Sequence, residues 1–379
     1  MSDGGTPVVD RFPTITDAQL EELRSMIGRE VRRPAPYLTE LNVDSIRHYA
    51  YGIGDPNPLW VDETYAKGTS HGRVMAPPTI LFATDRILSG YVTGLPGIHA
   101  MFAGADLRFH RAIGAGDHLH ANAVLFDIIE RKSQFAGRSL QQIYRVSVYD
   151  QHEELVATAD SYCFRTERDT ASSIGKYSEA QVPHWTPEQI EEIAQRYRDQ
   201  EQRRRGAEVR YVEDVNVGDA VPELTKGPYT ATTAIAYLLG WGGLYVRAHG
   251  DAYSLFERHP ALAIANEFGV PEPPERVHWD RELARRVGVP GAYDYGPERV
   301  SWMGHVATDW MGDHGVLERL SVQVRRHNLI GELVVCKGTV EEVDRSTGVV
   351  RLTLEAKNQD GEESARGFAE VKLPLRSGR

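Results

Sequence analysis

The second half of this 379-residue chain repeats the pattern of the first half. RLSVQVRRHNLIGELVVCKGTVEEV, near the C-terminus, parallels DLRFHRAIGAGDHLHANAVLFDI, and Gly331 then falls on Gly116. Arg326 falls on Arg111 at the same spacing of 215 residues. A repeat on this scale predicts two copies of one structural unit. The length of the chain also suits two domains of ordinary size.

Each copy begins with a helix and continues with antiparallel strands. Residues 44–62, DSIRHYAYGIGDPNPLWVD, have helical apolar spacing that ends at Gly54, and two prolines follow as stop signals. Residues 105–132 and 138–167 alternate apolar and polar side chains and are rich in Val, Ile, Tyr and Phe. The pattern predicts an α+β fold in which the helix buries its apolar face in the concave side of a curved sheet.

The duplication gives a domain division. We expect an N-terminal half over 15–168, a linker with a helix over 169–206, and a C-terminal half over 207–376. The helical segments of the halves align at a spacing of 189, and the segments beyond them at 218. The two spacings imply 29 inserted residues in the second half, near 244–275.

Composition excludes several classes of protein. The formal net charge of −11 disfavours nucleic-acid binding, and no apolar run is long enough to span a membrane. The only cysteines, Cys163 and Cys336, lie far apart in strand-like runs and predict buried thiols in a reducing compartment. With no basic and apolar leader at the N-terminus, we expect a cytoplasmic protein. The histidines form no metal-binding pattern, so no metal site is predicted.

The turn after the first helix carries a family resemblance. Gly54, Asp55, Asn57, Pro58 and Asp62 match the pattern Gly-Asp-x-Asn-Pro-x-His-x-Asp, but Trp60 stands at the His position. This motif resembles that of the MaoC-like (R)-specific enoyl-CoA hydratases and 3-hydroxyacyl dehydratases, and the N-terminal half resembles a FAS1-like dehydratase. The resemblance implies two hotdog domains in tandem, which form a pseudo-dimer. In the family, the His and the Asp are the acid/base pair.

The second half carries the missing histidine. At the spacing of 218, Trp60-Val61-Asp62 falls on His278-Trp279-Asp280, which resembles the family's His-x-Asp. At the spacing of 189, Trp60 instead falls on His249 and Asp62 on Asp251. We prefer His278, because its alignment also places Ala284 on Ala66.

The carboxylate partner of His278 stays open. We expect Asp55 and Asn57 to take part if the two halves bring their turns together; Glu272, Glu275 and Asp251 from the insertion are the alternatives. Short polar side chains also often cap turns, so Asp55 and Asn57 could simply hold the turn. His278 could likewise only pack beside Trp279.

Further residues are candidates for binding the thioester. In the family, a backbone N–H at a Gly holds the thioester oxygen; this position is Pro78 in the first half, which has no N–H, and Gly296 in the second. Substrate-binding candidates are Trp60, Tyr295, Arg325 and Arg326, the arginines for the phosphates of coenzyme A.

The resemblance implies hydration of a 2-enoyl-CoA or dehydration of a 3-hydroxyacyl-CoA, on long or bulky acyl groups. It needs no cofactor beyond the coenzyme A of the substrate. Two alternatives remain: a non-catalytic acyl-CoA-binding subunit that needs a partner hotdog protein, and a hotdog thioesterase. We expect a homodimer or a hetero-oligomer with another hotdog protein.

Overall fold

One large antiparallel sheet organises the molecule. The computed structural model describes residues 14–132, 138–167 and 182–376. Within these ranges nine strands pair in the order β2-β3-β4-β1-β8-β11-β10-β9-β5. The strands are β1 (His99–Phe109), β2 (His120–Lys132), β3 (Arg138–Tyr149), β4 (Leu155–Thr166), β5 (Ala220–Lys226), β8 (Val316–Val324), β9 (Val334–Asp344), β10 (Val349–Asn358) and β11 (Glu363–Lys372).

The two halves meet where β1 pairs with β8. The strands run antiparallel, with Leu107 opposite Leu320. The Arg319 guanidinium donates to both carboxylate oxygens of Asp106 across this seam, at 2.9 and 2.6 Å. The halves therefore share one sheet, and neither has a free edge at the junction.

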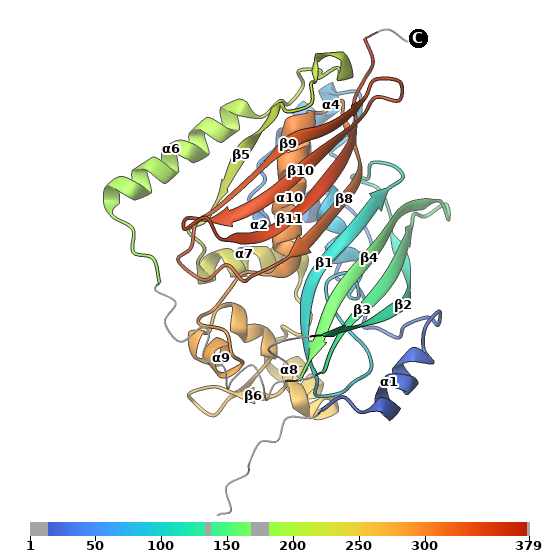
Figure 1. The fold of residues 1–379 in the computed structure, drawn as a ribbon, viewed down its shortest axis with the longest axis vertical. Coiled ribbons are helices and arrows are strands. Elements are labelled where there is room, and N and C mark those ends of the chain that lie inside the picture. Colours follow the sequence, from blue (N-terminus) through green and yellow to red (C-terminus); the bar gives the residue numbers. More distant parts are fainter. Residues whose placement is uncertain (1–13, 133–137, 168–181, 377–379) are drawn as a thin grey trace, which may run out of the picture.

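A long helix fills the concave side of this sheet. Helix α10 (Gly296–Met311) runs behind β8–β11 in Figure 1, and every residue from Pro297 to Met311 is buried. It packs against strands of both halves, including β1 and β8. The first half has only the short pieces η1 (Pro78–Ile80) and α5 (Leu81–Thr84) at this point. This arrangement confirms the α+β prediction of a helix enclosed by a curved antiparallel sheet.

The helices that begin the two repeats pack against each other. Helix α2 (Val43–Gly52) contacts α7 (Ala231–Trp241), and glycines allow their backbones to come close. A Cβ on Gly52 would lie 2.9 Å from the Ala236 carbonyl oxygen. A Cβ on Gly240 would lie 2.7 Å from both the carbonyl oxygen of His48 and the Cα of Tyr49.

The remaining helices surround this core. They are α1 (Asp17–Arg24), α3 (Pro58–Val61), α4 (Glu63–Gly68), α6 (Pro187–Arg203), α8 (His249–Arg258) and α9 (Arg281–Arg286). Thr186 caps α6, as its sequence predicts. Residues 169–181 of the expected linker lie outside the described ranges. Among the described helices, none combines the length and the apolar character needed to cross a bilayer.

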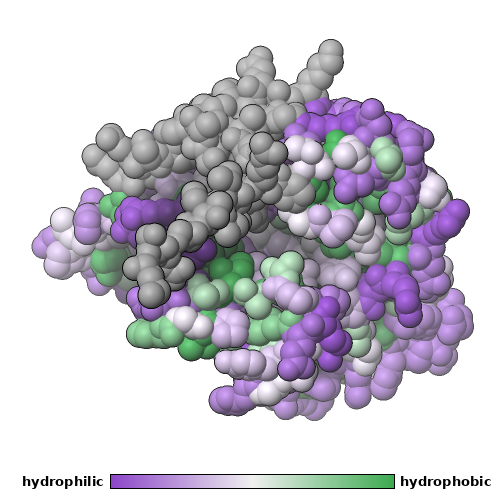
Figure 2. Space-filling view, turned by 90° about the horizontal axis from the view of Figure 1, so that it is seen from below, coloured by the Kyte–Doolittle hydropathy of each residue, from purple (hydrophilic) through white to green (hydrophobic). Residues whose placement is uncertain are grey.

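The insertion forms one end of the molecule. It contains α8 and a small hairpin of β6 (Ile264–Ala265) and β7 (Pro271–Glu272), which lie at the bottom of Figure 1 together with α9. Seen from this end, apolar side chains gather in patches among the polar ones (Figure 2). Three exposed apolar residues belong to the insertion: Tyr253, Phe268 and Val270.

The close approach of α2 and α7 can be tested by adding one methyl group. We expect Gly240→Ala to lower the free energy of unfolding by about 1–3 kcal/mol, because the new Cβ overlaps the α2 backbone. Gly68→Ala is the control: Gly68 also lies in a helix, but a Cβ there meets nothing within 4 Å. Denaturant titration compares the variants, and equal stability of the two would contradict this packing.

Candidate active site

The structure places His278 at the position that Trp60 occupies in the first half. Asp62, two residues after Trp60, caps α4 by accepting from the amides of Thr64 and Tyr65. Asp280, two residues after His278, caps α9 by accepting from the Leu283 amide at 2.9 Å.

Further contacts repeat at the spacings of 218 and 215 residues found in the sequence. Ala66 and its counterpart Ala284 are both fully buried. The backbone bridge between Met75 and Gly114 recurs between Tyr293 and Leu329. The two turns are therefore built alike, in agreement with the alignment of His278 with Trp60.

The surroundings of His278 favour its neutral form, with the proton on Nδ1. The Nδ1 atom lies 2.8 Å from the carbonyl oxygen of Tyr293. A carbonyl oxygen only accepts, so Nδ1 carries the proton and Nε2 of the neutral ring carries the lone pair. Burial lowers the pKa of His278 to about 4, against a weaker effect of the Tyr293 carbonyl. The side chain is only half-buried and neutral at physiological pH.

The ring of His278 rests on the start of α10. It stacks on Tyr295, with ring centroids 3.6 Å apart. Tyr295 was a substrate-binding candidate, but its side chain is buried and also packs against Trp241. Tyr295 therefore supports His278, and does not offer its ring to a ligand.

Gly296 follows directly as the first residue of α10. A Cβ at this position would lie 2.4 Å from Cδ1 of Phe102, so only glycine fits. The amide N–H of a first helical residue has no acceptor within its own helix, and it lies at the positive end of the helix dipole. Gly296 can thus stabilise negative charge developing beside His278.

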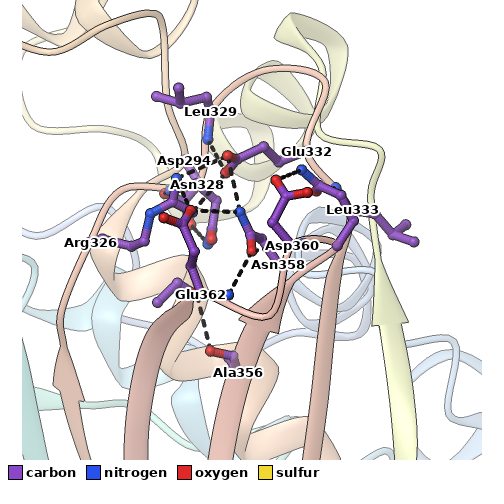
Figure 3. Close-up of polar contacts among 12 residues, drawn as sticks. Asp294, Arg326, Asn328, Leu329, Glu332, Leu333, Ala356, Asn358, Asp360 and Glu362 are labelled. Atoms are coloured by element: carbon purple, nitrogen blue, oxygen red, sulfur yellow. Dashed lines mark hydrogen bonds and ion pairs between the residues drawn. The ribbon is translucent and has the colours of Figure 1, made fainter. Parts of the chain in front are cut away.

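A network of ion pairs and hydrogen bonds holds the segment 293–296 before α10 in place (Figure 3). The Asp294 carboxylate accepts from the Arg299 guanidinium at 2.8 Å and from the Asn328 side-chain amide at 2.7 Å. Arg326 and Asn358 bind Glu332 in the same region. Since Asp294 sits between Tyr293 and Tyr295, the network fixes both the partner of His278 and the ring beneath it.

Glu275 brings a carboxylate to this turn. It lies three residues before His278 in the 3₁₀ helix Pro274–His278, and it is buried. Its carboxylate accepts from the amides of Leu244, at 2.8 Å, and Tyr245. At the spacing of 189, Leu244 is the counterpart of Asp55. The carboxylate of Glu275 therefore lies at the turn where the motif's aspartate would be. Burial raises its pKa, and the two amides oppose that shift only partly.

Asp55, the expected partner of His278, has other partners in the structure. Asp55 is 1% exposed and its carboxylate is already engaged. It accepts from the Trp60 indole Nε1 at 2.9 Å and from the Asn57 amide at 3.2 Å, and His305 Nε2 lies 3.3 Å away. Trp60, in place of the motif's histidine, thus helps to seal the aspartate in the interior. Asn57 caps α3 through its side-chain oxygen, as the turn-capping alternative anticipated.

Sequence reasoning missed the residues that surround Asp55. His305 Nε2 also lies 3.2 Å from Asp309 Oδ2, and Lys226 Nζ lies 2.9 Å from His305 Nδ1. Arg204 Nε contacts Asp309 Oδ1 at 2.9 Å. The spacing of His305 and Asp309 by four residues in a helical stretch was the one available signal, because it places both on one face.

A pocket lined by both halves lies beside this cluster. Its walls include Asn57, Trp60, Met311 and Leu317, with Arg111 at one side. Asp55 and His305 lie behind this wall and do not line the pocket.

The other predicted residues lie away from this chemistry. Arg326 forms an ion pair with Glu332 at 2.9 Å, just as Arg111 does with Asp117 in the first half; its role with coenzyme A stays a prediction. Arg325 is a surface side chain 3.7 Å from Glu363 and stays a candidate.

The competing pair from the insertion faces solvent. His249 is exposed at the start of α8, and Asp251, with 71% of its side chain exposed, lies 3.6 Å from Arg247. Glu272, another alternative carboxylate, pairs with Arg276. The alternative alignment of Trp60 with His249 therefore gives no site.

Comparisons with known proteins agree with this architecture. A family model described as FAS1-like, dehydratase domain region matches residues 25–159. A UPF0336 protein of Streptomyces coelicolor is 31% identical over 141 residues, which are 36% of this chain and 89% of that protein. A MaoC-like dehydratase structure superposes with a TM-score of 0.65 at 18% identity, over 93% of this chain and all of that one.

The chain belongs to the family of the UPF0336 proteins, and it has the tandem hotdog fold of the MaoC-like dehydratase structure. Its first half matches the FAS1-like dehydratase region, and this match suggests acyl dehydratase or hydratase activity. A Mycobacterium tuberculosis protein with a double hotdog fold covers 88% of this chain and 93% of its own, with a TM-score of 0.52 at 12% identity. A probable enoyl-CoA hydratase alpha subunit of Thermomonospora curvata is 27% identical over 158 residues, 36% of this chain and 49% of that protein.

Proposed function

We propose that this MaoC-like protein hydrates 2-enoyl-CoA thioesters and catalyses the reverse dehydration of 3-hydroxyacyl-CoA, at a site built from Glu275, His278 and Gly296. The observation that carries the proposal is the position of His278. It aligns with the position of the motif's histidine, its Nδ1 lies 2.8 Å from the Tyr293 carbonyl oxygen, and its ring stacks beside the start of α10. Coenzyme A enters as part of the substrate, and the reaction needs no separate cofactor.

The three groups divide the reaction among them. His278 Nε2 takes a proton from water while the water oxygen bonds to Cβ of the enoyl group. The electron pair of the double bond moves towards the thioester oxygen, which the Gly296 N–H stabilises. Glu275 then protonates Cα, and the proton on His278 returns to Glu275 through solvent. Burial suits Glu275 to the role of acid, because it raises the pKa of the carboxyl group.

We place the reaction in the second half because the first half cannot supply it. Trp60 has no proton to exchange under these conditions, and Asp55 is sealed behind it. Pro78 stands where Gly296 offers its amide, and proline has no N–H. The pocket beside Trp60 is therefore not the place of the chemistry.

The sealed first half also favours a second candidate, an acyl-CoA-binding subunit that acts with a partner hotdog protein. In that case the pocket lined by both halves would hold the acyl group, and a partner would bring the acid/base pair. Turnover by the purified chain alone would eliminate this candidate. Release of free thiol without hydration would instead indicate a thioesterase.

Substitution of His278 tests its role as the base. We expect His278→Gln to lower kcat/KM for enoyl-CoA hydration by about 10²–10⁴-fold, because it removes the group that activates water. Loss of enoyl-thioester absorbance, with short, long and ring-bearing substrates, measures the rate. His249→Gln is the control, since His249 is exposed on α8 and should leave the rate unchanged. Activity that survives in His278→Gln would remove this residue from the mechanism.

The pH profile gives an independent prediction. His278 must be neutral, so kcat/KM should rise as pH increases through about 4 and then level off. It should fall again where Glu275 ionises, at a pH above that of an ordinary glutamic acid, because the pKa of this acid is raised. Short stopped-flow assays avoid acid unfolding. An acidic limb near 6.5, the value of an ordinary histidine, would contradict the assignment.

A further inference from the structure

We infer that Asp55, His305 and Asp309 bind one divalent transition-metal cation, such as Zn²⁺, between the two halves. His305 Nε2 lies 3.3 Å from Asp55 Oδ1 and 3.2 Å from Asp309 Oδ2. All three ligand atoms lie within 4.8 Å of one another, and all three side chains are buried. This site is separate from Glu275 and His278, and it does not depend on the proposed reaction.

Both distances from His305 Nε2 fit the spacing of metal ligands. Zinc bonds to histidine nitrogen and carboxylate oxygen are about 2.0–2.2 Å long, which places neighbouring ligands of a tetrahedral ion about 3.4 Å apart. The two distances from His305 Nε2 are close to this value. One nitrogen and two carboxylate oxygens form a donor set that zinc accepts, with a fourth position left open.

Two of these atoms lack any other partner. His305 Nε2 and Asp309 Oδ2 are fully buried, and neither makes a hydrogen bond to the described residues. Their side chains are 2% and 7% exposed. A buried carboxylate oxygen that accepts no hydrogen bond costs free energy, and a bound cation would remove that cost.

Surrounding contacts orient each ligand. Arg204 Nε donates to the other oxygen of Asp309 at 2.9 Å. The Trp60 indole donates to the other oxygen of Asp55 at 2.9 Å. Partners of this kind fix the direction of ligand atoms in metal sites.

Lys226 holds the other ring nitrogen of His305. Its Nζ lies 2.9 Å from His305 Nδ1 and from the carbonyl oxygens of Ile53 and Gly54. This contact orients the imidazole ring so that Nε2 lies beside Asp55 and Asp309.

The position of the site gives the cation a structural role. Asp55 follows α2 in the first half, whereas His305 and Asp309 lie on α10 of the second. A bound cation would join the motif turn of one half to the central helix of the other.

Metal titration tests this inference. Chelator-treated full-length protein is titrated calorimetrically with Zn²⁺. We expect one equivalent per chain, and at least 10-fold weaker binding in Asp309→Asn. The control is Glu298→Gln, a buried carboxylate on the same helix that binds Tyr229 and lies outside the ligand set; it should bind Zn²⁺ normally.

A measurement on the unaltered protein covers the case in which Asp309→Asn does not fold. One bound Co²⁺ per chain should give visible absorption of a low-symmetry nitrogen and oxygen site, and Zn²⁺ should abolish that absorption and raise the melting temperature. No stoichiometric binding of either ion would overturn the inference. Zn²⁺ binding that is equal in folded Asp309→Asn and Glu298→Gln would overturn it as well.

Discussion

The antiparallel pairing of β1 with β8 is the interaction on which the rest of the molecule depends. It turns two repeats into one sheet and leaves a single concave surface for α10 to fill. Because α10 contacts both halves, its residues can serve either repeat: Gly296 begins the helix beside His278, and His305, further along, reaches Asp55 of the first half. A mutation that weakened the β1–β8 pairing would therefore disturb the surroundings of His278 and those of Asp55 together.

Duplication has produced two versions of one motif turn. In the first, Trp60 replaces the histidine and donates to Asp55, so the aspartate becomes part of a buried ion cluster. In the second, the histidine is kept, but the aspartate is replaced in space by Glu275, which reaches the equivalent amides from the end of the insertion. The buried cluster around Asp55 joins the first half to α10 of the second.

The sequence predicted the duplicated fold because periodicity and glycine spacing are local signals. The spacing of 218 residues also placed His278 on Trp60, and the matching caps of Asp62 and Asp280 agree with it. The partner of Asp55 was not predictable in this way. His305 lies 250 residues further along the chain and meets Asp55 only because α10 crosses between the halves.

The contacts of Arg326 and Glu275 were also hidden from sequence reasoning, because they too depend on how the chain folds back on itself. Arg326 resembled a phosphate ligand on a strand, but the following turn folds back and brings Glu332 to it. Glu275 could be proposed only as one of several carboxylates, since its place depends on the path of the whole insertion. Pairing within a turn can be read from sequence, whereas pairing between distant segments requires the packed structure.

A crystal structure with a saturated acyl-CoA, which binds but cannot be hydrated, tests the central claim most directly. The account predicts that the thioester oxygen accepts from the Gly296 amide and that Cβ of the acyl chain faces His278 Nε2, with Glu275 near Cα. A thioester bound instead beside Asn57 and Trp60, without contact to Gly296, would contradict the assignment of the reaction to the second half.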